Sequence, residues 1–195
     1  MRNLVSALAL CTAAPAPAVA PQGLAVQPIT IGTTHSVASA PMGEARIVNV
    51  VLPAGYVKEP KKRYPVLYLI DGGLEQDLLH VAGAVHLGAV WARSAEAIVV
   101  GIETKDRRKE LSGPTQDAEL LKRYPTAGSS ASFRGFIRDE VKPLITTHYR
   151  TNGRDVVLGE SLGGLFIVET FMADPTLFDA YAAIDPSLWW DREAL

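Results

Sequence analysis

The chain has 195 residues, of which 48% are hydrophobic and 21% are charged, and its formal net charge is −2. This length predicts one domain with a substantial hydrophobic core, and the composition is ordinary for a globular protein. The small net charge gives no reason to expect nucleic acid or an anionic membrane surface as a partner. The two short basic runs, at 61–63 and 107–109, fall between apolar strands and are expected to be solvated loops.

Residues 1–20 have the pattern of a secretory signal peptide. Arg2 precedes the apolar stretch 4–11, and an Ala/Pro-rich run ends in Ala18-Val19-Ala20. The apolar centre is too short to span a bilayer, and the small residues at the end suit a signal peptidase, although Pro21 is unfavourable directly after that site. The sequence therefore predicts an exported protein, periplasmic or secreted.

The only cysteine, Cys11, lies inside this leader, so the mature chain is expected to contain neither a disulfide nor a thiol nucleophile. Leu10 is too bulky to precede the cysteine of a lipoprotein box. Lipid anchoring is therefore not expected.

After the leader, residues 21–43 are predicted to form an extended N-terminal arm, and residues 44–195 a single domain. Apolar runs predict strands, and the segments between them predict helices, in an alternating order. The expected strands are 45–53, 64–70, 97–102, 155–158 and 180–184, and the expected helices are 74–92, 133–148 and 165–172. Pro143 should kink the second helix because it lacks an N–H group. Residues 103–130 are predicted to be a long polar excursion.

Alternating strands and helices indicate a mostly parallel sheet with helices on both faces, which is an α/β architecture. Within it, residues 159–164 spell G-x-S-x-G with an extra glycine, between the strand 155–158 and the helix 165–172. This arrangement is typical of a nucleophile elbow, in which a serine sits at a strained strand-to-helix turn. It makes Ser161 the predicted nucleophile and the Leu162 N–H one donor of an oxyanion hole. The alternative is a glycine-rich turn with an idle serine.

The expected base for this nucleophile is missing from the sequence. In the fold that carries this elbow, the catalytic triad runs serine, acid, histidine along the chain, yet no histidine follows Ser161. His35, His80, His86 and His148 all precede it. We expect packing or surface roles for these four, with His148 on the core side of the helix before the elbow.

The chain resembles the esterase D / enterochelin esterase-like family of α/β-hydrolases over roughly residues 44–195. The segments that carry the resemblance are 66–72, 99–102 with 106–107 and 111–112, 133–149, 159–164 and 185–191, the last reading D-P-S-L-W-W-D. The resemblance implies an α/β-hydrolase fold, and it implies that the triad acid and histidine lie on further strands. The chain is thus expected to be C-terminally truncated and to lack the C-terminal strands.

The family resemblance also suggests roles for residues outside the elbow. An N–H group from Gly72 or Gly73 would supply the second oxyanion donor, although a plain turn after a strand explains both glycines nearly as well. Asp185 is a weaker candidate for the acid, and Trp189 and Trp190 are weaker candidates for lining a substrate pocket, since paired aromatics more often pack in a core. Asp106 and Arg107 fit a solvated loop better than a position facing the site.

Taken together, these features predict an exported serine esterase that hydrolyses small carboxylic esters, of siderophores or of other molecules, without cofactor or metal. Two alternatives stay open. The chain could be a truncated or degenerate homologue without ester turnover, or an acyltransferase of the same superfamily that uses a sugar hydroxyl instead of water. A sheet without its last strands should also expose an apolar edge that invites self-association.

Overall fold

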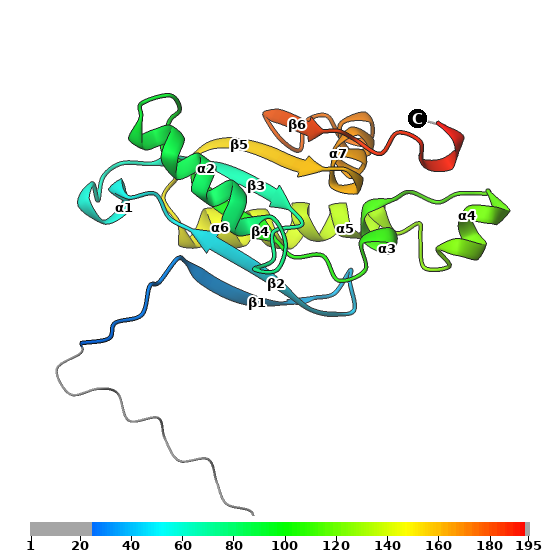
Figure 1. Ribbon diagram of the computed structural model, residues 1–195, viewed down its shortest axis with the longest axis horizontal. Helices are drawn as coiled ribbons and strands as arrows, with labels where there is room; N and C mark the ends of the chain where they lie inside the picture. The colour runs from blue at the N-terminus through cyan, green and yellow to red at the C-terminus, as the bar shows by residue number, and fades with distance from the viewer. Residues whose placement is uncertain (1–24, 194–195) are drawn as a thin grey trace, which may run out of the picture. The chain divides into compact units, whose positions relative to one another are not determined.

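The computed structural model describes residues 25–193, so the predicted signal peptide at 1–20 lies outside the described residues. All described helices and strands belong to the compact unit that begins at Ile31. They build a six-stranded sheet of order β1-β2-β4-β3-β5-β6 (Figure 1). The strands are β1 (Thr33–Ser39), β2 (Glu44–Val51), β3 (Tyr64–Ile70), β4 (Ile98–Ile102), β5 (Thr151–Glu160) and β6 (Ala180–Ile184).

The sheet is mixed in a way that the sequence predicted only in part. β3 pairs in parallel with β4 and β5, and β5 pairs in parallel with β6, as the alternation of strands and helices predicted. β1 and β2 pair antiparallel with each other, and β2 pairs antiparallel with β4. β1 corrects the predicted N-terminal arm, because residues 33–39 are a strand of the domain rather than a separate segment. The missed signal is the weak alternation of small polar residues, which suits an exposed edge strand.

Helices cover both faces of the sheet, and their bounds differ modestly from the predicted ones. The longer helices are α2 (Leu78–Val90) and α7 (Leu162–Ala173); the shorter ones are α1 (Gly55–Lys58), α3 (Arg107–Leu111), α4 (Ala118–Arg123), α5 (Ser130–Phe136) and α6 (Lys142–His148). A π-helical turn, η1 (Ile137–Val141), joins α5 to α6, and a 3₁₀ turn, η2 (Trp190–Arg192), follows β6.

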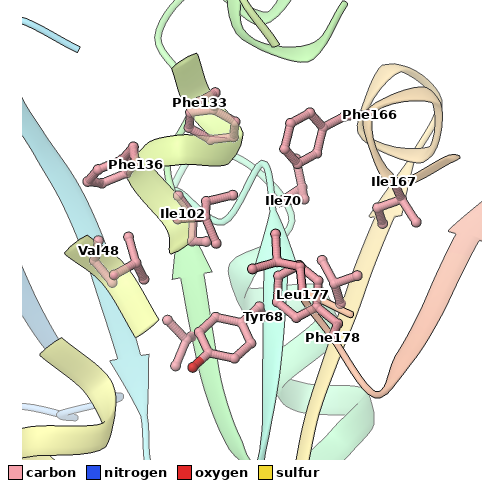
Figure 2. Packing of buried hydrophobic residues seen from close by; sticks show 14 of the residues in the cluster. Val48, Tyr68, Ile70, Ile102, Phe133, Phe136, Phe166, Ile167, Leu177 and Phe178 are labelled. Atoms are coloured by element: carbon pink, nitrogen blue, oxygen red, sulfur yellow. The ribbon is translucent and has the colours of Figure 1, made fainter. Parts of the chain in front are cut away.

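The main core lies on the face that α5, η1, α6 and α7 cover. Alternate residues of β3 and β4 point into it, because side chains alternate between the two faces of a strand. Figure 2 shows Ile70 and Ile102 of the sheet facing Phe133 and Phe166 of the helices, and Tyr68 beside Phe178. On the opposite face, Leu78 and Ala82 of α2 pack on Val99 in a smaller cluster. Burial of apolar surface on both faces makes the sheet the centre of the domain.

The predicted kink at Pro143 takes the form of a π-turn. The Lys142 N–H reaches back five residues to the Ile137 carbonyl, and Pro143 then stands in the first turn of α6. Proline is tolerated in a first turn because its missing N–H has no helical acceptor there. The widened turn thus separates two short regular helices, α5 and α6.

A buried ion pair joins the polar excursion to the sheet. Arg46 on β2 is 0% exposed, and its guanidinium donates to both carboxylate oxygens of Glu110 on α3, at 2.8 and 2.7 Å. The same guanidinium donates to the Glu103 carbonyl at 2.9 Å and to the half-exposed Glu44 at 2.8 Å. The excursion predicted for 103–130 therefore contains ordered helices, α3 and α4, which begin at the capping residues Asp106 and Asp117.

Removing one partner of this buried pair should destabilise the fold strongly. We expect Glu110→Ala to lower the free energy of unfolding by about 3–5 kcal/mol, because it leaves the Arg46 charge buried without its carboxylate. Glu44→Ala is the matched control, since it removes the exposed partner of the same arginine and should cost less than about 1 kcal/mol. Urea denaturation followed by circular dichroism measures both, and equal losses would contradict this assignment.

The helix after the elbow packs unusually close to the chain that follows β6. A Cβ atom added to Gly164 on α7 would lie 2.9 Å from the Pro186 Cα and 3.0 Å from the Ile184 carbonyl oxygen. Both are backbone contacts that no side-chain rotation relieves. Only glycine at position 164 therefore allows α7 and the segment 184–187 to lie in direct contact.

We expect Gly164→Ala to lower the free energy of unfolding by about 1–3 kcal/mol, because the methyl group must push this segment aside. Gly135→Ala on α5 is the control, since an added Cβ there meets nothing within 4 Å. Alanine at that helical position should stabilise the protein by about 0.5–1 kcal/mol. Thermal or urea unfolding of the two variants compares them, and a neutral Gly164→Ala would refute the close contact.

Candidate active site

The predicted nucleophile stands where β5 ends and α7 begins, at the carboxyl edge of the parallel strands. Ser161 has φ 55° and ψ −113°, a left-handed region that non-glycine residues rarely occupy. An added Cβ on Gly159 would lie 2.9–3.2 Å from Gly163 backbone atoms, so glycine there lets the two sides of the turn approach. The Ser161 side chain is only partly buried. This is the backbone form that the elbow motif predicted, and ligands bind at this edge in open α/β sheets.

The three predicted oxyanion donors differ in how their N–H groups are used. Leu162 is the first residue of α7, and within residues 25–193 its N–H donates to no other group. The Gly72 N–H donates to the Ile102 carbonyl at 2.9 Å, which commits it to the backbone. The Gly73 N–H donates to the Gln76 side-chain oxygen at 2.9 Å. A side chain can rotate away, so Gly73 is the better second donor of the two glycines.

A chain of polar contacts anchors the loop that carries Gly72 and Gly73. Gln76 also donates to the Thr104 carbonyl at 2.9 Å, and the Thr104 hydroxyl donates to Asp71. Asp71 is buried at the end of β3, and it accepts from Arg107 through Nε at 3.0 Å and Nη2 at 2.9 Å. The loops after β3 and β4 are therefore tied together beside the elbow.

This network lies next to the first turn of α7. An added Cβ on Gly163 would be 3.5 Å from Asp71 Oδ2. Arg107, which we expected in a solvated loop, neutralises that carboxylate while its side chain stays 39% exposed. The sequence offered no signal for the pair, because Asp71 and Arg107 are 36 positions apart in the chain.

The segment after β6 lies directly against the elbow. The Ser161 N–H donates to the Ile184 carbonyl and the Ser187 N–H donates to the Ser161 carbonyl, both at 3.0 Å. The Ser161 and Ser187 hydroxyl oxygens are 3.1 Å apart, within hydrogen-bonding distance. Ser187 belongs to the P-S-L-W-W segment, and the sequence alone indicated no role for it beside Ser161.

The other candidates on this segment occupy different environments. Asp185 has φ 41° and is exposed, and within residues 25–193 its carboxylate makes no hydrogen bond or ion pair. Trp190 is 3% exposed and belongs to the main core, whereas Trp189 is 52% exposed. Of the two tryptophans, only Trp189 presents appreciable surface to a ligand.

Residues of the polar excursion, 103–130, also contact the segment that follows β6. Thr115 donates to Asp191, Arg192 donates to Asp117 at 2.6 Å, and Tyr124 packs on Trp190 with ring centroids 6.0 Å apart. The hydrogen bond from the Arg192 guanidinium keeps the pKa of Asp117 below its ordinary value. Through these contacts α4 and its flanking residues pack against the segment that follows β6.

None of the four histidines is hydrogen-bonded to Ser161. His35 contacts the Tyr149 hydroxyl at 2.6 Å, and His80 and His86 are exposed on α2. His148 was expected on the core side of its helix, but it is exposed at the last position of α6 and bonds the Leu144 carbonyl. The regular period that predicted its burial is broken by the π-turn. Among the described residues, no group of three or more His, Cys, Asp and Glu side chains is placed to hold a metal ion.

A sizeable cavity lies away from these residues. Its volume is about 610 Å³, and it is lined by α2, the end of β2 and the start of β4, with His86 and Glu96 as its main polar groups. The elbow contributes nothing to it. Across residues 25–193, no helix has the length and apolar character needed to cross a membrane.

Comparison with known proteins identifies the family of the chain. A family model described as "Putative esterase" matches residues 39–194. The chain is 28% identical over 168 residues to the ferri-bacillibactin esterase BesA of Bacillus subtilis, covering 76% of this chain and 56% of that protein. It is 26% identical to the siderophore triacetylfusarinine C esterase of Aspergillus fumigatus, covering 76% and 53%. The chain thus spans about half the length of the curated relatives it matches.

Solved structures share the fold. An IroE-like serine hydrolase from Shewanella oneidensis superposes with a TM-score of 0.72 at 30% identity, covering 82% of this chain and 52% of that one. The BES protein of Bacillus cereus superposes with a TM-score of 0.75 at 23% identity, covering 89% and 69%. With the family match across most of its length and this shared architecture, the chain belongs to the esterase family and has the α/β-hydrolase fold.

Proposed function

We propose that this chain carries the nucleophile of a serine esterase that acts on small carboxylic esters. The observation that supports the proposal most directly is the strained backbone of Ser161 at the carboxyl end of β5, beside the Leu162 N–H, which has no acceptor within residues 25–193. A strained turn of this kind exposes the serine oxygen and aims the first amides of the following helix at the site. The esterase relatives make ester hydrolysis the reaction to expect.

In the proposed reaction, Ser161 Oγ attacks the ester carbonyl carbon and its proton passes to a base. The new C–O bond places negative charge on the carbonyl oxygen, which the Leu162 and Gly73 N–H groups would stabilise. Collapse of this intermediate breaks the bond to the alcohol, which leaves with a proton, and water then hydrolyses the acyl-serine. The scheme needs a base, and none of the four histidines is hydrogen-bonded to Ser161.

The substrate class we propose is the ester linkages of siderophores. One of the two relatives is a ferri-bacillibactin esterase, and the other is a siderophore triacetylfusarinine C esterase. Trp189, two residues after Ser187, is half-exposed, and it is the aromatic surface that we propose for substrate contact. The predicted signal peptide places this activity outside the cytoplasm, as part of the same proposal.

A fluorophosphonate probe tests the nucleophile directly. Its phosphorus should bond to Ser161 Oγ with loss of fluoride, and imidazole in the buffer should accept the Oγ proton and accelerate the reaction. We expect mass spectrometry to find one adduct on the Ser161 peptide, formed faster as imidazole rises. Ser161→Ala should lose the adduct, and it should lower imidazole-assisted hydrolysis of p-nitrophenyl acetate to the rate of imidazole alone.

The control is Ser132→Ala, an exposed serine on α5, which should label like the original chain. An adduct on another residue would refute Ser161 as the nucleophile. Failure to form any adduct at high imidazole would instead favour the non-catalytic alternative.

We also propose that the chain associates with itself through β6. This strand ends the sheet of the described residues, it pairs only with β5, and Ile184 on it is 49% exposed. An unpaired strand edge offers backbone groups to a second strand. We expect size-exclusion chromatography with light scattering to show a mass that rises with concentration, and Ala180→Lys to suppress that rise. A monomer of constant mass would contradict the proposal.

A further inference from the structure

Ser187 is the hydrogen-bond partner of the predicted nucleophile. Its hydroxyl oxygen lies 3.1 Å from Ser161 Oγ, and the side chain is 5% exposed. Within residues 25–193, neither hydroxyl has another side-chain or backbone partner. We propose that Ser187 is a positioning residue that holds Ser161 Oγ in one rotamer, an inference that rests on the esterase function proposed above.

The backbone brings the two serines together. The Ser187 N–H donates to the Ser161 carbonyl, and the Ser161 N–H donates to the Ile184 carbonyl, so the two segments are bonded in both directions. The close approach of Gly164 to Pro186 lets the segment lie flat against α7. Asp185, with its positive φ, turns the chain between the end of β6 and Ser187. Ile184 at the end of β6 and the three residues after it are thus arranged around one serine.

The chemistry of a hydroxyl limits what Ser187 can do. A serine hydroxyl is a donor and an acceptor, but it does not take up a proton at neutral pH, so it cannot act as the general base. The 3.1 Å separation is also longer than the roughly 2.7–2.8 Å typical of O–H···O bonds. A bond of this kind orients its partner without activating it.

Orientation is what the nucleophile needs at this turn. A serine side chain has three staggered rotamers, and a partly exposed hydroxyl would otherwise distribute among them. When Ser187 donates to Ser161 Oγ, the Ser161 proton stays free to leave toward a base, while the oxygen keeps its position for attack. Holding one rotamer of three raises the fraction of molecules in the geometry from which reaction occurs.

The test compares Ser187→Ala with Ser187→Thr, which keeps the hydroxyl, in fluorophosphonate labelling with imidazole. We expect Ser187→Ala to lower the labelling rate at saturating probe by about 3- to 10-fold, the effect of losing one neutral hydrogen bond. The probe concentration at half-maximal rate and the pH dependence should not change, and Ser187→Thr should recover most of the rate. Ser112→Ala is the matched control, since Ser112 is equally buried but bonds the Arg108 carbonyl.

The outcomes separate this proposal from the esterase proposal. An unchanged rate in Ser187→Ala, or a loss of about 10³-fold or more with a shifted pH profile, would overturn the positioning role. If the original chain is not labelled, the esterase proposal fails, and crystal structures of the original chain and Ser187→Ala decide the present one. Several Ser161 rotamers in the variant support it, and one unchanged rotamer overturns it. If Ser187→Ala does not fold, Ser187→Cys replaces it.

Discussion

The strained backbone of Ser161 is the constraint around which the rest of the domain is organised. A non-glycine residue in this conformation costs about 1–3 kcal/mol, so the surrounding structure must hold it there. β5 and α7 hold it through the close contact of Gly159 with Gly163, and β6 holds it through the Ile184 carbonyl. Three elements therefore converge on a single residue, and each meets it at the carboxyl edge of the sheet, where ligands bind in open α/β sheets.

Ion pairs hold the loops in place, as close packing holds the elbow. The Arg46–Glu110 pair fastens α3 to the sheet, and the Asp71–Arg107 pair fastens the end of β3 to the same helix. Both pairs use residues of α3, the first helix of the polar excursion. The Arg46–Glu110 pair is buried on both sides, so separation would leave each ion without compensation, whereas Arg107 of the other pair stays partly exposed. The excursion is therefore a structural part of the candidate site.

Local patterns predicted the elements that local sequence determines. The elbow at 159–164 was readable because its glycines and its flanking strand and helix are contiguous in the chain, and the alternation of apolar runs predicted the parallel part of the sheet. The edge strand β1 was missed because its alternation involves small polar residues. The π-turn before Pro143 was missed because proline predicts a disturbance and not its form. Its consequence was an incorrect orientation for His148.

Sequence patterns could not predict contacts between segments that are distant in the chain. Ser187 meets Ser161 across 26 positions, and Arg46 meets Glu110 across 64, so no spacing in the sequence announces either pair. The sequence also could not predict which acceptor each backbone N–H group bonds. Gly72 and Gly73 are adjacent identical residues, yet the Gly72 N–H bonds the backbone of β4 and the Gly73 N–H bonds the Gln76 side chain. Such distinctions depend on register and loop geometry, which only the fold provides.

The tryptophan pair that follows Ser187 has a consequence for the fluorescence of the protein. The chain contains three tryptophans, and two of them, Trp189 and Trp190, follow Ser187 with ring centroids 6.0 Å apart. One indole is enclosed by the core and the other faces solvent. Any displacement of this segment changes the solvent contact of the enclosed indole and the coupling between the two rings. The intrinsic fluorescence of the chain thus reports whether the segment that contacts Ser161 is held in place.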